Sequence, residues 1–225
     1  MSQTYFVTGT DTEVGKTAIS CALLQAAARE GLRTAAVKPV AAGCDELGQN
    51  EDALQLMANM TEQLDYAQVN PVALAPAIAP HIAAQQEGRQ IQASRLVGLC
   101  RGVMLGAADF VLIEGAGGWR VPISSRETLA DLARELRVGV ILVVGMRLGC
   151  INHALLTAEA VRRDGLELAG WVANQPGVRM NCHAENLATL QSMLPAPFLG
   201  EVPHVSPWDP AEAAKSLSLP DFKGK

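Results

Sequence analysis

The chain has 225 residues, 49% of them hydrophobic and only 4% aromatic, and carries a formal net charge of -5. This length and composition predict one good-sized domain spanning 1–225, with the tail from about residue 206 as its least defined part. No cluster of Lys and Arg indicates a nucleic-acid surface, and the longest apolar run, 138–146, is far shorter than the ~20 residues that cross a membrane.

The cysteines and the N-terminal segment indicate a cytoplasmic protein. Five cysteines, an odd number, are scattered along the chain without a C-x-x-C pair, which is typical of reduced thiols. Residues 1–10 carry neither the charged nor the apolar region of a signal peptide. The four histidines lack the spacing of zinc ligands.

Short apolar runs alternate with amphipathic stretches, which predicts strands alternating with helices. In chain order we expect a strand at 5–8, a helix at 16–30, a strand at 34–37, a short helix at 50–57, an irregular stretch with short strand pieces at 61–80, a helix at 91–105, a strand at 110–113, a helix at 128–136, a strand at 138–144, a helix at 151–163, a strand at 169–173, a helix at 182–193 and a last short strand at 196–199. The run at 138–144 is apolar throughout, as in a strand buried on both faces. The sequence therefore predicts an α/β protein with a mostly parallel sheet flanked by helices on both faces.

The sharpest motif is a glycine-containing segment, Gly-Thr-Asp-Thr-Glu-Val-Gly-Lys-Thr at 9–17, between the first strand and the first long helix. This is the context of a Walker A phosphate loop, in which backbone N–H groups and the helix N-terminus surround the phosphates. Gly15 lets the main chain come close, Lys16 faces the β- and γ-phosphates, and the Thr17 hydroxyl is placed to bind Mg2+. One departure is Thr10, which stands where the G-x-x-x-x-G-K-[ST] pattern has glycine. The alternative is an ordinary strand–turn–helix with chance glycines.

Two further polar residues follow predicted strands. Glu114 ends the strand at 110–113 and opens a glycine-rich turn, and a carboxylate there can orient Mg2+ beside a phosphate loop. A solvated strand end is the alternative for Glu114. Lys38 follows the strand at 34–37, where it could hold a second anionic group or lie on the surface. The residues alone do not choose between these interpretations of Lys38.

These motifs combine with others into a recognisable set. The set comprises the loop at 9–17, Lys-Pro-Val at 38–40, Glu-Gly-Ala-Gly-Gly-Trp at 114–119, Gly-Cys-Ile-Asn-His-Ala at 149–154, Gly-Trp-Val-Ala-Asn at 170–174 and Gly-Glu-Val-Pro at 200–203. Together they resemble the dethiobiotin synthetases, the ATP-dependent carboxylases of biotin synthesis, over roughly residues 4–205. The resemblance implies a fold of the P-loop NTPase type.

The resemblance also implies a ring closure that depends on Mg2+ and ATP. One amine of 7,8-diaminononanoate takes up CO2 to form a carbamate, which attacks the γ-phosphate of ATP. The second amine then closes a cyclic urea, dethiobiotin, and expels phosphate. No covalent enzyme intermediate is needed, so positioning and charge stabilisation carry the catalysis.

The matching positions imply specific roles. Lys38 matches the active-site lysine, which holds the carbamate and the developing phosphoryl charge, and Thr12 and Glu13 are further catalytic residues in the loop. Glu13 is an unusual neighbour for phosphates, and we expect it to face the diamine or the water shell of the metal ion. The implied metal ligands are Thr17, Asp52 and Glu114. Without the resemblance, Asp52 would be interpreted as an ordinary acidic residue in the first turn of a helix.

The remaining positions bind nucleotide or substrate. The implied nucleotide contacts are Glu13, Val14, Gly15, Lys16, Thr17, Ala18, Asp52, Glu114, Gly115, Ala116, Gly117, Asn174, Gln175, Pro203, His204 and Val205. Asn174 and Gln175 would read the adenine, although Asn174 is equally consistent with a turn former. The implied substrate contacts are Lys38, Ala42, Gly149, Cys150, Ile151 and Asn152. In the family, the segment 149–152 opens a helix whose free N–H groups take the substrate carboxylate of the other subunit, which implies a homodimer with the active site at its interface.

Two departures from the family lie on the diamine side. Ala42 stands where relatives often have Ser, and Asn186 where a Tyr helps to cover the substrate. One alternative is therefore an ATP-binding paralogue with a changed substrate. Another is a partition-type P-loop ATPase, but these carry an additional lysine early in the loop, where this chain has Thr-Gly-Thr at 8–10. A related amidoligase needs a glutaminase domain, for which the chain has no room.

Overall fold

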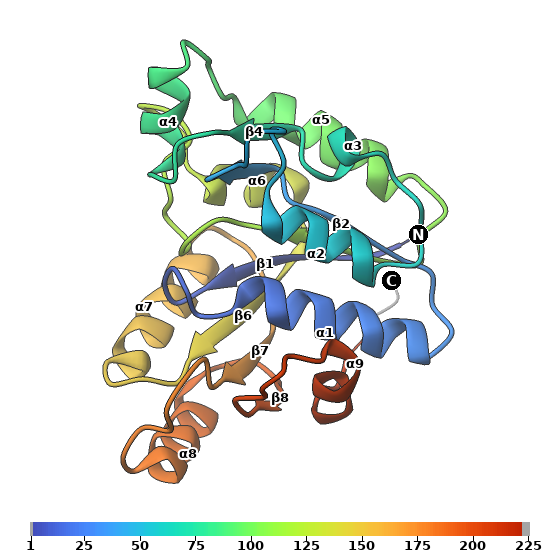
Figure 1. Ribbon diagram of the computed structural model, residues 1–225. Helices are drawn as coiled ribbons and strands as arrows, with labels where there is room; N and C mark the ends of the chain where they lie inside the picture. The colour runs from blue at the N-terminus through green and yellow to red at the C-terminus, as the bar shows by residue number, and fades with distance from the viewer. Residues whose placement is uncertain (1, 222–225) are drawn as a thin grey trace.

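The structure, a computed structural model, describes residues 2–221, and its centre is a six-stranded parallel sheet (Figure 1). The strands are β1 (Gln3–Gly9), β2 (Thr34–Val37), β5 (Phe110–Glu114), β6 (Gly139–Gly145), β7 (Leu168–Asn174) and β8 (Phe198–Val202). Their order across the sheet is β2-β5-β1-β6-β7-β8, and every neighbouring pair is parallel. The predicted α/β architecture with a mostly parallel sheet is confirmed.

Helices cover both faces of this sheet (Figure 1). They are α1 (Lys16–Arg29), α2 (Glu51–Asn59), α3 (Tyr66–Val69), α4 (Pro80–Gln86), α5 (Ala93–Met104), α6 (Leu129–Leu136), α7 (Cys150–Arg163), α8 (His183–Met193), α9 (Pro210–Ala213) and the 3-10 turn η1 (Ala214–Ser216). On one face α1 packs against α2 and α9, and on the other α5 packs against α6. Within the described residues, no helix is both long and apolar enough to cross a bilayer.

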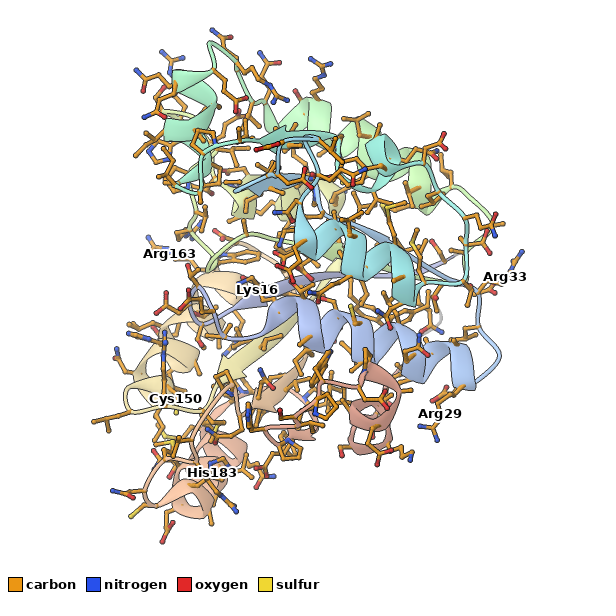
Figure 2. The ribbon with its side chains drawn as sticks, viewed as in Figure 1. Lys16, Arg29, Arg33, Cys150, Arg163 and His183 are labelled. Carbon is orange, nitrogen blue, oxygen red and sulfur yellow. The ribbon has the colours of Figure 1, made fainter. Side chains whose placement is uncertain are left out.

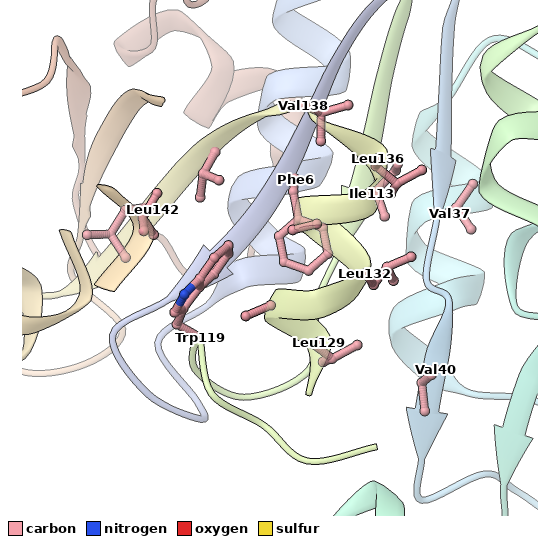
Figure 3. Close-up of a cluster of buried hydrophobic side chains, with 14 of the residues drawn as sticks. Phe6, Val37, Val40, Ile113, Trp119, Leu129, Leu132, Leu136, Val138 and Leu142 are labelled. Carbon is pink, nitrogen blue, oxygen red and sulfur yellow. The ribbon is translucent and has the colours of Figure 1, made fainter. Parts of the chain in front are cut away.

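Two apolar clusters lie between the sheet and these helices. Successive strand residues point to opposite faces, so Phe6 belongs to one cluster and its neighbours Tyr5 and Val7 belong to the other. Figure 3 shows Phe6 beside Trp119, with the two rings edge to face and their centroids 5.9 Å apart. Because β6 is buried on both faces, its residues are almost all apolar, as the sequence predicts.

The segment after β2 is more ordered than the sequence predicts. β3 (Val40–Ala42) pairs in parallel with β4 (Val72–Leu74) to form a separate two-stranded sheet, and β4 confirms the expected strand piece in 61–80. The helices α3 and α4 were not expected. The α4 helix begins with Pro80, whose fixed backbone angle suits the first turn of a helix.

The C-terminal part also differs from expectation. The last strand runs from Phe198 to Val202, which is later than the expected 196–199. The tail forms α9, where the carboxylate of Asp209 accepts a hydrogen bond from the N–H of Ala211 at 2.9 Å. Such a cap satisfies a helix N–H that has no partner within the helix. Residues 222–225 of the tail lie outside the described residues.

Candidate functional site

The loop at 9–17 joins β1 to α1 at the carboxyl edge of the sheet. Figure 2 shows Lys16 at the beginning of α1, at the opposite end of this helix from Arg29. Gly15 precedes the helix with φ 83, and a Cβ atom there would lie 2.2 Å from Asn174 Nδ2. Only glycine fits this left-handed and crowded position. The Lys16 ammonium group bends back over the loop and donates to the carbonyl of Asp11 at 3.2 Å.

The departure at Thr10 has a structural explanation. The N–H of Thr10 donates to the carbonyl of Val143 at 3.0 Å, and its hydroxyl oxygen accepts from the N–H of Gly145 at 3.4 Å. Thr10 therefore fastens the loop to the end of β6. The side chain of Val14 packs against Gly145 so closely that a Cβ atom at Gly145 would lie 2.8 Å from it.

Lys38 lies at the centre of a buried cluster of charged side chains. Its backbone is fixed after β2, because its N–H donates to Val69 O and its carbonyl accepts from Asn70 Nδ2, each at 2.7 Å. Its Nζ donates to Glu114 Oε1 at 2.6 Å and to Asp52 Oδ2 at 2.8 Å. Lys38 is 3% exposed and Glu114 is fully buried, so the interpretation of Lys38 as a surface residue is wrong. Glu114 is likewise no solvated strand end.

The three predicted metal ligands converge at this cluster. The Thr17 hydroxyl donates to Glu114 Oε1 at 2.8 Å, and Asp52 reaches the same place from the first turn of α2 through its bond to Lys38. Glu114 Oε2 is buried and has no hydrogen-bond partner. An unpaired carboxylate oxygen in the interior is costly unless another group compensates its charge.

The buried cluster changes the proton affinities of its members. Burial acts to lower the pKa of Lys38, but the carboxylates of Glu114 and Asp52 outweigh it, and the pKa is raised. Burial acts to raise the pKa of Asp52, but Lys38 outweighs it, and the pKa is lowered. Burial, and then the nearby charge of Lys38, lower the pKa of Lys16 to about 8. Lys38 and Asp52 are therefore charged at neutral pH, whereas the Lys16 ammonium group is the more easily neutralised cation.

A cavity of about 720 Å³ opens beside the phosphate loop and Lys38. Its polar residues are Thr12, Glu13, Lys16, Thr17, Lys38, Asn50, Asp52 and Arg120. Its small and apolar residues are Gly15, Ala41, Ala42, Ala77, Ile78, Ala79, Pro80, Ala116, Gly117, Val121 and Pro122. The cavity thus joins phosphate-binding and charged groups to an apolar wall, and it can hold a molecule with both polar and aliphatic parts. Gly115 does not line the cavity, but its carbonyl accepts a hydrogen bond from Nζ of Lys38, which does, at 3.4 Å.

Two polar residues of this cavity, Asn50 and Arg120, are not among the predicted site residues. Asn50 caps α2, with its side chain accepting from the N–H of Ala53, and an Asn before an acidic first turn is a signal that could have identified it. Arg120 forms an ion pair with Asp164, with Nη1 and Oδ2 2.8 Å apart. No local pattern marks this pair, because the two residues lie 44 positions apart in the chain.

The predicted adenine contacts lie on the other side of the loop, at the ends of β7 and β8. Asn174 is buried, and its Nδ2 donates to the carbonyl of Val14 at 2.8 Å. Gln175 is also buried, and its backbone N–H donates to the carbonyl of Val202, immediately before 203–205. Asn174 therefore lies against the phosphate loop and Gln175 against the end of β8, and neither residue lines the cavity at Lys38. Ala18 lies one residue after Thr17 in the first turn of α1.

The segment 149–152 lies beyond the end of β6, where α7 begins (Figure 2). The N–H of Cys150 donates to the carbonyl of Arg147 at 2.9 Å, so the expectation that the N–H groups of this segment are free is wrong at Cys150. The side chain of Arg147 pairs with Asp11 of the phosphate loop at 2.5 Å. None of the residues 149–152 lines the cavity as the described part of the chain forms it. Asn186, on α8, donates to the carbonyl of Cys182 and also lies outside that cavity.

The strand, loop and helix at the carboxyl edge of a parallel sheet, with a buried acid after the neighbouring strand, define a P-loop nucleotide-binding protein. A family model described as an AAA domain matches residues 3–212. The ATP-dependent dethiobiotin synthetase BioD of Marinobacter nauticus is 55% identical over 219 residues, covering 96% of this chain and 94% of the relative. The Pseudomonas aeruginosa protein of the same name is 56% identical and covers 96% of each chain. The chain belongs to the ATP-dependent dethiobiotin synthetase family and is an ATP-using ligase of biotin biosynthesis.

Similarity to more distant solved structures shows the fold alone. A ParA family ATPase from Chlorobium tepidum superposes with a TM-score of 0.56 at 11% identity, covering 92% of this chain and 86% of that one. The MinC:MinD complex of Aquifex aeolicus gives 0.56 at 14% identity, covering 91% and 82%. These proteins therefore share their fold with this chain, whereas the synthetases also share its sequence.

Proposed function

We propose that the protein carboxylates 7,8-diaminononanoate with CO2 and closes the cyclic urea of dethiobiotin. The reaction converts one ATP to ADP and phosphate. The observation that carries this proposal is the cavity beside the phosphate loop. Its charged end, around Lys38 and Lys16, suits a carbamate and a γ-phosphate, and its apolar wall at 77–80 suits an aliphatic chain. A diamine attached to a fatty-acid chain has both features.

The proposed reaction needs positioning and charge stabilisation. One amine of the diamine attacks CO2 and loses a proton, giving a carbamate whose oxygen attacks the γ-phosphorus of ATP as ADP leaves. The second amine attacks the carbonyl carbon of the resulting anhydride and expels phosphate. Lys38 and Lys16 stabilise the negative charge on the carbamate and the phosphates, and Thr12 and Glu13 of the loop orient the amines.

The residues around Glu114 fit a magnesium ion. Mg2+ prefers carboxylate and hydroxyl oxygens, and Glu114 Oε2 is a buried oxygen without a hydrogen-bond partner. Thr17, Asp52 and Glu114 would hold the ion. When bound, it supplies neutralisation of charge on the β- and γ-phosphates.

The other nucleotide and substrate contacts are part of the same proposal. Residues 114–117 lie beside the phosphates, and Asn174, Gln175 and 203–205 surround the adenine. The closeness of Asn174 to the carbonyl of Val14 supports this, since it places the amide next to the phosphate loop. Segment 149–152 takes the substrate carboxylate in the active site of the partner subunit of a homodimer. The observation that this segment does not line the cavity of its own chain supports that arrangement.

We further propose that residues 1–225 act as one domain in the cytoplasm, where the five free cysteines remain reduced. Neither a nucleic acid nor a membrane takes part in the proposed reaction.

The test follows phosphate release from Mg-ATP and bicarbonate, with and without 7,8-diaminononanoate, and detects the cyclic urea by mass. We expect release that depends on the diamine and formation of the urea. The variant Lys38→Ala should lower kcat by about 10³-fold or more. Lys215→Ala, at an exposed residue paired with Glu212, is the matched control and should leave the rate unchanged. ATP binding without diamine-dependent turnover would contradict the proposal.

A further inference from the structure

Lys38 lies between two carboxylates where a divalent cation bound to the same oxygens would also lie. Its Nζ is 2.6 Å from Glu114 Oε1 and 2.8 Å from Asp52 Oδ2. Mg2+ binds oxygen at about 2.0–2.1 Å, so an ion that bridges these two oxygens would occupy the space of the ammonium group. We propose that the Lys38 ammonium group and the divalent cation compete for Glu114 and Asp52, and that cation binding moves the Lys38 side chain into the cavity.

Only the side chain of Lys38 has to move. Its backbone is held by the hydrogen bonds to Val69 and Asn70, which the exchange leaves intact. The lysine side chain is a flexible four-carbon stem with a compact charge at its end. Lys38 already lines the cavity together with Thr12 and Glu13, so a short swing of the stem brings its charge towards the proposed substrate.

Thr17 can contribute an oxygen to the cation that replaces the Lys38 ammonium group. Its hydroxyl hydrogen is directed at Glu114 Oε1, at 2.8 Å, which leaves the oxygen lone pairs of the hydroxyl available to a cation. Glu114 Oε1 therefore accepts hydrogen bonds from two donors, the Thr17 hydroxyl and the Lys38 ammonium group. Replacing the Lys38 ammonium group by a metal ion keeps the charge at this oxygen compensated.

The exchange couples metal binding to catalysis. This inference rests on the proposed roles of Asp52 and Glu114 as metal ligands and of Lys38 as the carbamate contact. While Lys38 serves as the counterion of the two acids, its donors are used by Glu114, Asp52 and the carbonyl of Gly115. Release of these bonds by the cation makes the ammonium group available to the carbamate. The cation should therefore bind before the carbamate is held.

A second binding mode gives the opposite prediction. A cation held through Glu114 Oε2, the oxygen without a partner, could leave the bond between Lys38 and Oε1 in place. In that mode Lys38 affects the cation only as a nearby positive charge. Any other lysine of the same cavity would then act similarly.

The test measures binding of Mn2+ alone, without nucleotide, by electron paramagnetic resonance. We compare the wild type with Lys38→Met and Lys16→Met, which each remove one positive charge from the same cavity. Lys16 donates to the carbonyl of Asp11, so its removal frees no position between the carboxylates. Lys38→Met should tighten Mn2+ binding at least about tenfold, and clearly more than Lys16→Met. Equal effects of the two variants, or no gain with Lys38→Met, would overturn the competition.

A crystal structure of the wild-type protein with Mn2+ provides a measurement that needs no variant. The anomalous signal should lie within bonding distance of Asp52 and Glu114 Oε1, with Lys38 Nζ more than about 4 Å from both acids. Manganese at Glu114 Oε2 with Lys38 still bound to both acids would contradict the inference. Neither measurement requires turnover, so both outcomes are independent of whether the proposed diamine reaction is correct.

Discussion

Ala42 lies on the wall of the cavity beside Lys38, at a position where the resemblance to the synthetases leads us to expect a serine. A serine hydroxyl there could donate to or accept from the reacting amines. We expect Ala42→Ser to lower the KM for the diamine by roughly tenfold, because a hydrogen bond to a charged group contributes about 1.5–3 kcal/mol. Steady-state kinetics with each substrate varied in turn would measure this, and the KM for ATP should not change.

A matched control for this gain is Ala77→Ser, which adds the same hydroxyl to the apolar part of the cavity wall. It should not lower the KM for the diamine. If both variants lower it equally, the effect is general polarity of the cavity, and the specific contact at Ala42 is not made.

Gly15 allows a second prediction about a single residue. Gly15→Ala combines a left-handed backbone with a contact of 2.2 Å between the new Cβ atom and Asn174 Nδ2, so the phosphate loop must shift. We expect the affinity for ATP, measured by titration calorimetry, to fall by at least about tenfold. Gly31→Ala is the control, since Gly31 has φ 84 but no atom within 4 Å of the added carbon. It should cost about 1 kcal/mol of stability and leave ATP binding unchanged.

At the scale of elements, the sequence predicts most of the long helices and central strands, because the signals for these elements lie within their own residues. The apolar run of β6 and the glycine-lysine junction of α1 need no distant partner to be recognised. β3 and β4 were not predicted as a pair because each has only three residues, and their stability depends on pairing between Val40 and Val72, far apart in the chain. The α4 helix was missed because Ala79, which precedes it, is not a capping residue.

The candidate site was predictable to a similar degree. Parallel strands end at one edge of a sheet, so Lys38 and Glu114 were expected near the phosphate loop. Their direct contact was not, because the sequence does not indicate that Lys38 is buried. The pairing of Arg120 with Asp164 has no sequence signal at all, since it depends on how α7 packs against the glycine-rich turn.

The start of α6 supports a prediction about stability and pH. The Asp131 carboxylate accepts from the N–H of Thr128 at 2.7 Å and from its hydroxyl at 2.9 Å. Burial acts to raise the pKa of Asp131, but the hydrogen bonds from Thr128 and the charge of Arg134 outweigh it, and the pKa is lowered. Ionised Asp131 therefore stabilises the folded state above the pKa of the unfolded chain, and this stabilisation is lost as the pH falls through the lower folded-state value.

We expect Asp131→Ala to reduce the free energy of unfolding by about 1 kcal/mol at pH 7. The difference from the wild type should shrink as the pH is lowered below about 4, where the carboxylate becomes protonated. Urea unfolding at several pH values would measure it. Asp131→Asn serves as the control, because it keeps an acceptor oxygen without the charge. A difference that is constant with pH would show that the charge of Asp131 does not contribute.

At the scale of the whole molecule, the strand order explains the division of the site. β1 carries the phosphate loop between β5, which ends at Glu114, and β6, which leads to 149–152. The cluster around Lys38 therefore lies on the β5 side, and the beginning of α7 lies on the β6 side. The ion pair between Arg147 and Asp11 connects the two sides across the loop. One chain thus contains a candidate nucleotide site with its acids and, separately, a helix start that does not line that cavity.

If the segment 149–152 serves the partner subunit, two inactive variants should restore activity to each other. Lys38→Ala removes the catalytic charge. Asn152→Glu places a carboxylate against the substrate carboxylate. This variant should still fold, because an acidic residue in the first turn stabilises a helix.

In a mixed dimer, one active site carries both substitutions and the other carries neither. Random mixing makes half of the dimers mixed, so unfolding and refolding the two variants together should restore about one quarter of the wild-type kcat. Each variant refolded alone is the control, and a mixture no more active than these controls would show that every site is built from a single chain.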